Sequence, residues 1–240
     1  MEESAPLRRS AVAGLFGVAF VTLGIGLVAG SPPPDASTEV IVNHLADDED
    51  HVRSLLCSLF LVPGFALLLW FAAALRSVLA QMSSTDRLPS IVLPGMAVFA
   101  TAGLGGQALT AAPAVAAAVT RPEVVDPAAY RLFTVAGLFL ALGGLAGAAV
   151  LVAATSRVAG EAGSLPLVAE VGGYLVAVTC ALGYFGYGVA VPLLLLWLTG
   201  ACIAVWRFAS RRRTGDVGDT PPGSPTEGSP GSRRPARPVP

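Results

Sequence analysis

The sequence predicts an all-α protein: a six-helix transmembrane bundle with short loops, one short external helix and a disordered C-terminal tail. Hydrophobic residues make up 54% of the 240 residues and charged residues only 13%. The mean hydropathy is +0.69, and so little charge cannot cover the surface of a soluble fold. Apolar stretches of about 20 residues, the length that crosses a bilayer, alternate with short polar loops.

The predicted membrane domain covers residues 11–208, after a cytoplasmic N-terminus at residues 1–10. Its last apolar block, Leu165–Trp206, is too long for one crossing. We divide it at Gly183–Gly188, because glycines allow a tight turn and aromatic rings favour the membrane–water interface. The predicted spans are residues 11–30, 53–79, 91–119, 132–155, 165–182 and 189–206.

The first span has an alternative interpretation as a signal peptide. It follows Arg8 and Arg9, and Val28-Ala29-Gly30 is a tolerable cleavage site. Its apolar run exceeds the roughly 7–15 residues of a signal peptide. We therefore favour a retained helix; cleavage would leave five spans.

A short external helix is predicted between the first two spans. Pro32–Pro34 end the first membrane helix, and Asp35 is placed to cap a helix that runs to about Ala46. Ile41 and Leu45 are four residues apart, so they share one face of that helix.

The acidic loop also holds a candidate metal site. His44, Asp48 and His51 are spaced four and three residues apart, so on a continuous helix they would share a face, as zinc or copper ligands do. However, Asp47 is predicted to cap the second membrane helix, with Asp50 in its first turn, which breaks the helix between these ligands. We predict a solvated acidic loop, with no metal and no other cofactor.

Glu170 is the only acidic residue inside a predicted span, and an ionisable side chain there is a functional candidate. At 1.5 Å per residue from Leu165 it lies about 8 Å into its helix. It is expected to line a proton or cation route with Tyr174, to reach the cytoplasmic interface, or to pair with an arginine. The candidate arginines are Arg76, Arg87 and Arg157.

Gln107 is the one amide inside a span. Counted from Ile91, it lies about 24 Å along the third helix, near the outer side. Glu170 lies near the inner side, so we expect the two side chains not to meet.

The arginines predict the orientation of the chain, because cytoplasmic loops carry the excess of positive charge. The N-terminus, the second and fourth loops and the C-terminal flank hold most of them, whereas the first and third loops are acidic. Both termini are therefore predicted in the cytoplasm. All 15 basic residues are arginine, which is typical of a GC-rich bacterial genome and indicates a bacterial plasma membrane.

The tail, residues 209–240, is rich in proline, glycine and serine from Thr214 onward. Such a segment cannot bury enough apolar surface to offset its chain entropy, so it is predicted to be disordered and cytoplasmic.

Small residues are predicted to pack the helices within one subunit. Gly26 and Gly30 form one G-x-x-x-G pair, and Gly143 and Gly147 form a second. The three cysteines all lie in apolar stretches, where no disulfide or zinc site is expected. They are Cys57, Cys180 and Cys202.

Residues 34–76 resemble uncharacterised bacterial multi-pass membrane proteins. The shared features are a Pro-Asp-Ala start at Pro34–Ala36, Leu69-Trp70-Phe71, and Ala74-Leu75-Arg76. The resemblance implies the same topology and carries no activity and no site.

The favoured function is a non-enzymatic envelope protein with an interaction or structural role. The lipid bilayer is its expected partner; a protein partner at the acidic external loop is open, and a net charge of −1 argues against nucleic acid. The alternative is a small-molecule or ion permease that uses Glu170. An intramembrane enzyme ranks third, because no nucleophile–base pair is visible.

Overall fold

The computed structural model describes residues 4–28, 30–83, 87–120, 125–163 and 166–215. Within these ranges the chain forms seven α-helices and no strand. Five of the helices are long and apolar enough to cross a membrane. The helices are α1 (Ser4–Val28), α2 (Thr38–Ala46), α3 (Asp48–Met82), α4 (Arg87–Val119), α5 (Pro127–Glu161), α6 (Leu167–Ala181) and α7 (Gly183–Gly215).

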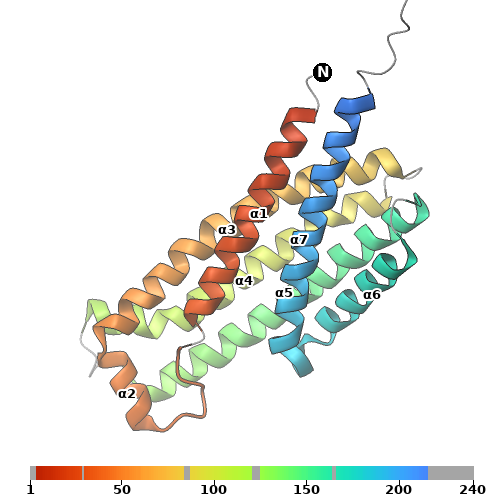
Figure 1. The fold of residues 1–240 in the computed structure, drawn as a ribbon. Helices are drawn as coiled ribbons and strands as arrows, with labels where there is room; N and C mark the ends of the chain where they lie inside the picture. Colours follow the sequence, from red (N-terminus) through yellow and green to blue (C-terminus); the bar gives the residue numbers. More distant parts are fainter. Residues whose placement is uncertain (1–3, 29, 84–86, 121–124, 164–165, 216–240) are drawn as a thin grey trace, which may run out of the picture.

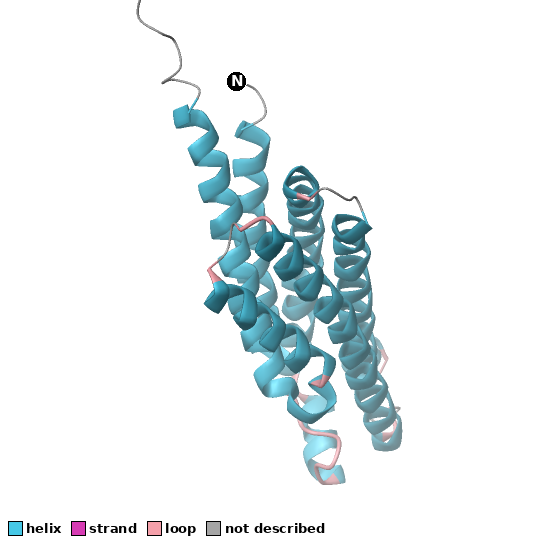
Figure 2. Cartoon of the chain, turned by 90° about the vertical axis from the view of Figure 1, so that its right-hand side faces the viewer, coloured by secondary structure: helices cyan, strands magenta, loops and turns pink. Residues whose placement is uncertain are grey.

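The helices other than α2 form a closed ring in chain order. Each packs against the next along the chain, and α7 returns to α1. α2 lies across one end of the ring, where it contacts α3, α4 and α5 (Figure 1). Because neighbouring helices run in opposite directions, α1 begins and α7 ends at the other end, as Figures 1 and 2 both show.

Large apolar side chains cover the outside of the ring. Phe16, Leu59, Trp70 and Leu196 are each more than half exposed. A soluble protein would bury such side chains, whereas a bilayer solvates them. By the length and hydropathy of its helices, the chain is a multi-pass membrane protein embedded in lipid.

α6 is shorter than predicted. Its 15 residues span about 22 Å, against a hydrocarbon core of about 30 Å. The division of the last apolar block is confirmed by a turn at Leu182. Five of the six predicted spans correspond to helices long enough to cross a membrane, and α6, in the place of predicted span 165–182, begins after Pro166.

The segment Gly183–Gly188 is helical, and the prediction that it forms the turn is wrong. α7 begins at Gly183. A β-carbon at this position would lie 2.5 Å from the Leu145 side chain of α5. The glycine therefore lets α7 start in direct contact with α5.

The external helix begins later than predicted. Ser37, and not Asp35, caps α2: its hydroxyl accepts a hydrogen bond from the Val40 amide at 3.4 Å. A turn closed by the bond from the Ala36 amide to the Pro33 carbonyl (3.0 Å) holds Asp35 outside the helix. Asp47 caps α3 as predicted, accepting from the Glu49 amide at 2.9 Å.

The apolar face predicted for α2 is confirmed. Ile41 and Leu45 are buried and form a small cluster with Ala117 of α4 and Tyr130 of α5. These contacts hold α2 across the end of the ring.

Both ends of the membrane domain are more helical than predicted. α1 begins at Ser4 and not near Ala11, and α7 continues to Gly215, so residues 209–215 of the predicted tail are helical. Basic side chains favour the C-terminal end of a helix because they offset its negative partial charge. The rest of the predicted tail, residues 216–240, lies outside the described residues.

The tightest helix contact joins α4 and α5, backbone against backbone. A β-carbon added to Gly147 would lie 2.7 Å from the Gly95 carbonyl oxygen, and one on Gly95 would lie 2.8 Å from the Gly147 carbonyl oxygen. Gly106 and Gly137 show the same reciprocal contact, at 2.6 and 2.5 Å. No residue larger than glycine fits at these positions without moving a helix.

The two G-x-x-x-G pairs predict only part of this packing. Gly147 contacts α4, but Gly143 and Gly26 have nothing within 4 Å of an added β-carbon. On α1 the contact is made by Gly17, whose added β-carbon would lie 3.0 Å from the Gly64 carbonyl oxygen of α3.

We expect Gly147→Ala to lower the free energy of unfolding by about 1–3 kcal/mol, because the new methyl group would meet a backbone carbonyl that cannot move alone. Gly143→Ala, one turn away on the same helix, should be neutral or stabilise by up to about 1 kcal/mol through helix propensity. Unfolding of both variants in detergent by denaturant titration measures the difference. Equal stability of the two would contradict the close contact.

Candidate functional site

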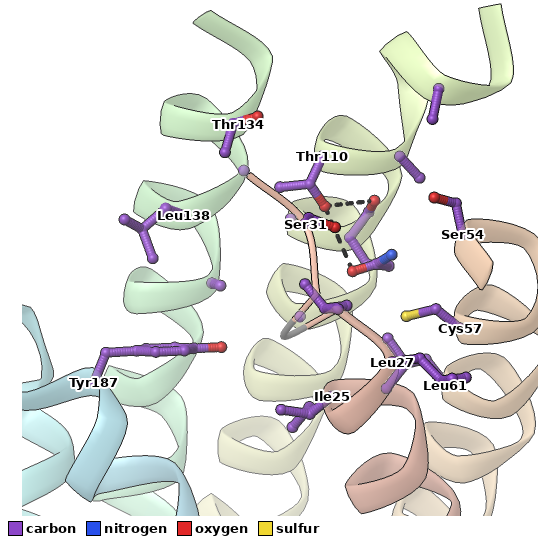
Figure 3. Close-up of a pocket in the computed structure, with 18 of the residues that line it drawn as sticks. Ile25, Leu27, Ser31, Ser54, Cys57, Leu61, Thr110, Thr134, Leu138 and Tyr187 are labelled. Carbon is purple, nitrogen blue, oxygen red and sulfur yellow. Dashed lines mark hydrogen bonds between the residues drawn. The ribbon is translucent and has the colours of Figure 1, made fainter. Parts of the chain in front are cut away.

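A cavity of about 430 Å³ lies inside the ring at the end covered by α2. Its walls come from α1, α3, α4, α5 and α7, and residues 31–34 of the first loop close part of it (Figure 3). Cavities of roughly 300–1,000 Å³ are the usual size for small-molecule sites. The cavity is partly open to the outside.

The deeper walls of the cavity are apolar. Leu61 and Phe65 come from α3, Phe99 from α4, and Leu138 and Leu145 from α5. The rings of Phe65 and Phe99 meet edge to face, with centroids 5.4 Å apart. These side chains would bury an apolar ligand surface rather than hold a water-filled channel.

Polar side chains gather near the α2 end of the cavity. The Tyr130 hydroxyl donates to the Pro32 carbonyl at 2.9 Å, which ties α5 to the first loop. The Thr110 hydroxyl donates to the Gln107 carbonyl at 3.0 Å (Figure 3). Thr134 is different: its hydroxyl is buried beside Tyr130, and none of the described residues gives it a hydrogen bond of good geometry.

Asp50 links two basic lining residues. Its Oδ2 lies 2.6 Å from His44 Nδ1, and its Oδ1 accepts a hydrogen bond from Arg53 Nη1 at 3.2 Å. His44 is buried, and Arg53 is partly exposed. His44 and Arg53 line the cavity, whereas Asp50 does not. The Asp50 carboxylate therefore binds both basic side chains without itself facing the cavity.

The local fold explains how these residues meet. Asp47 ends α2 and caps α3, so the chain turns sharply between the two helices. That turn returns Asp50, in the first turn of α3, to His44 in the last turn of α2. A single continuous helix would place these residues on different faces.

The three residues of the candidate metal site do not converge. His44 pairs with Asp50, while His51 Nε2 donates to the Leu45 carbonyl at 2.9 Å. Asp48 is fully exposed and lies 3.8 Å from His51 Nδ1. In the described part of the chain, no group of three or more histidine, cysteine, aspartate or glutamate side chains is placed to hold a metal ion.

Glu170 lies at the opposite end of the bundle, in the first turn of α6. Its carboxylate rests directly over Gly160 of α5. Arg157, one of its three candidate partners, pairs instead with Glu161, at 2.6 Å, and also interacts with Tyr174. The spacing of four residues along one helix favours that local pair over the one between helices.

Gln107 and Glu170 occupy separate regions. Gln107 lines the cavity, together with Thr110 of the same helix. No residue of α6 lines it, so neither Glu170 nor Tyr174 takes part. Of Gln107, Glu170 and Tyr174, the cavity therefore contains Gln107 alone.

Six polar lining residues were not among the candidates predicted from the sequence: Ser31, Arg53, Ser54, Tyr130, Thr134 and Tyr187. Arg53 had a signal, since it is a charged residue at the start of an apolar span. No feature of the sequence pointed to Tyr130, Thr134 or Tyr187. They come from α5 and α7, and a single sequence does not predict which helices pack around the cavity. In Figure 3, Tyr187 reaches into the cavity from α7, opposite Cys57 of α3.

Comparisons with known proteins give no identification. No protein-family model, no curated protein and no solved structure matches this chain. The resemblance of residues 34–76 to uncharacterised bacterial membrane proteins stays a prediction.

We expect Asp50→Ala to destabilise the protein by about 1.5–3 kcal/mol, because it removes charge-assisted hydrogen bonds to His44 and Arg53. The matched control is Asp48→Ala, two residues earlier in the same helical turn. Its side chain is fully exposed and its contact with His51 is long, so its loss should leave the melting temperature nearly unchanged. Thermal unfolding in lipid nanodiscs measures both variants. A larger fall in melting temperature for Asp48→Ala than for Asp50→Ala would contradict the contacts of Asp50 with His44 and Arg53.

Proposed function

We propose that the chain crosses a bacterial plasma membrane six times, with both termini in the cytoplasm and α2 outside. Two observations support this orientation. α1 begins and α7 ends at the same end of the bundle (Figure 1), and that end carries Arg8, Arg157 and Arg207. The Arg8 guanidinium lies over the Trp206 ring, 4.4 Å from its centroid, a pairing suited to the membrane interface.

In this topology α6 is the fifth crossing despite its length. Without it, the five long helices would place the termini on opposite sides. A short apolar helix is accommodated by local thinning of the bilayer and by flanking polar side chains that reach the interface. The packing of α1 against both α3 and α7 supports a first helix that is retained.

The orientation predicts which introduced cysteines react from outside the cell. Glu39→Cys in α2 should react with a membrane-impermeant maleimide in intact cells. Ala162→Cys, after α5, should react only once the membrane is permeabilised. Both positions are exposed, and the buried native cysteines provide the unreactive background. If Ala162→Cys reacts in intact cells and Glu39→Cys only after permeabilisation, the orientation is opposite to the one proposed.

We propose that the protein is a non-enzymatic membrane protein that binds a small molecule in the cavity beneath α2. The observation that carries this proposal is the cavity itself, which combines apolar walls with a few polar groups at one end. The Thr134 hydroxyl supports it, since buried polar groups normally have a hydrogen-bond partner and a ligand would supply one.

The cavity favours this function over the other interpretations. A protein partner at the acidic loop has less to bind, because Asp47 and Asp50 are engaged in a helix cap and in pairs with His44 and Arg53. A permease that uses Glu170 lacks a route, because no α6 residue lines the cavity. As for catalysis, the Cys57 thiol donates to the Gly24 carbonyl at 3.2 Å and is not paired with a base.

Filling the cavity should abolish binding. With octanoate or octanol at a hundredfold excess over its dissociation constant, we expect the melting temperature in nanodiscs to rise by about 5 °C. Ser54→Phe should remove this rise, because Ser54 lines the cavity. Ser58→Phe is the matched control: both hydroxyls donate to the carbonyl four residues earlier, but Ser58 does not line the cavity. Absence of a shift with both probes in the native protein would refute the proposal.

A further inference from the structure

We infer that the cavity selects an amphiphile with an anionic oxyacid head group, a carboxylate or phosphate, on a medium-length apolar chain. This inference rests on the ligand-binding function proposed above and adds the chemistry of the ligand.

The charges of the lining give the first argument. Among the described residues that line the cavity, Arg53 is the one with a permanent charge, His44 is the one histidine, and there is no aspartate or glutamate. Asp50 holds Arg53 and His44 without itself lining the cavity. A ligand therefore meets the basic side of this cluster, which favours an anion and disfavours a cation.

The unused hydrogen-bond donors give the second argument. Arg53 Nη1 donates to Asp50, whereas Nε and Nη2 have no partner among the described residues. The buried Thr134 hydroxyl also has no hydrogen-bond partner among them. An oxyacid head accepts several hydrogen bonds at once, and the planar guanidinium matches its paired oxygens.

Gly30 makes room for this arrangement. The Arg53 guanidinium lies against Gly30, and an added β-carbon there would collide with Nη1. The glycine thus lets the arginine lie along the first loop, at the polar end of the cavity. A larger residue would displace the guanidinium from its bond to Asp50.

The shape of the cavity gives the third argument. Along α3, its lining runs from Arg53 past Leu61 to Phe65, about 18 Å at 1.5 Å per residue. The polar groups lie at the Arg53 end, and Leu145 and Val191 line the cavity with Phe65. A head group at Arg53 would place its chain along the apolar walls.

The test compares four probes with the same eight-carbon chain: octanoate, octyl phosphate, octanol and octyltrimethylammonium. Binding to the full-length protein in nanodiscs is measured by calorimetry, with empty nanodiscs as the blank. We expect one or both anions to bind about tenfold or more tightly than octanol, and the cation to bind least. The two anions tell a carboxylate site from a phosphate site.

Arg53→Gln should weaken binding of the preferred anion about tenfold and leave octanol unchanged. Arg131→Gln is the matched control, because Arg131 lies at the same end of the bundle, donates to the Ala36 carbonyl at 3.1 Å and does not line the cavity. It should bind all four probes as the native protein does. If Arg53→Gln does not fold, the ranking of the probes on the native protein decides alone.

The outcomes distinguish failure of the anionic head group from failure of ligand binding in the cavity. Octanol binding as tightly as both anions would overturn the anionic head group and leave the cavity as a binding site. Tightest binding of the cation would do the same. If no probe binds above the empty-nanodisc blank, both the head-group inference and the ligand-binding function fail.

Discussion

The bundle depends on the contact between the backbones of α4 and α5. Gly95 meets Gly147, and Gly106 meets Gly137, at distances that exclude any side chain. In lipid there is little hydrophobic force between helices, so van der Waals packing must hold them together. The close approach of α4 and α5 increases that packing. The same contact shapes the cavity, because Gly106 and Gly137 both belong to its wall. A wider spacing here would separate Gln107 and Thr110 of α4 from the polar residues of α5.

One carboxylate organises the polar end of the cavity. Asp50 belongs to an acidic run that has an ordinary role in starting a helix, and its neighbour Asp47 fills that role. Asp50 itself binds His44 and Arg53, so a residue that favours the N-terminus of α3 also positions two lining side chains. The acidic loop is therefore partly an internal support and not only a surface.

Local patterns in the sequence predicted local structure well. Hydropathy located the long helices, and the division of the last apolar block was correct to within a few residues. The cap at Asp47 follows from side-chain chemistry alone. The length of α6 and the cap at Ser37 were missed. Pro166 makes α6 start later than predicted, and the turn between Pro33 and Ala36 holds Asp35 outside α2. The cavity could not be predicted, since residues as distant as Arg53, Thr134 and Tyr187 meet only through ring closure, and one sequence holds no record of that contact.

Closure of the ring between α1 and α7 has a consequence for biogenesis. α1 leaves the ribosome before α7 and packs against it, where an added β-carbon on Gly14 would lie 2.6 Å from Cys202 Sγ. Chains are made from the N-terminus at about 5–20 residues per second, so α1 inserts long before its partner exists. Until then, the face of α1 that will meet α7 is covered by lipid or by the insertion machinery. The ring of helices therefore closes only after α7 has been synthesised.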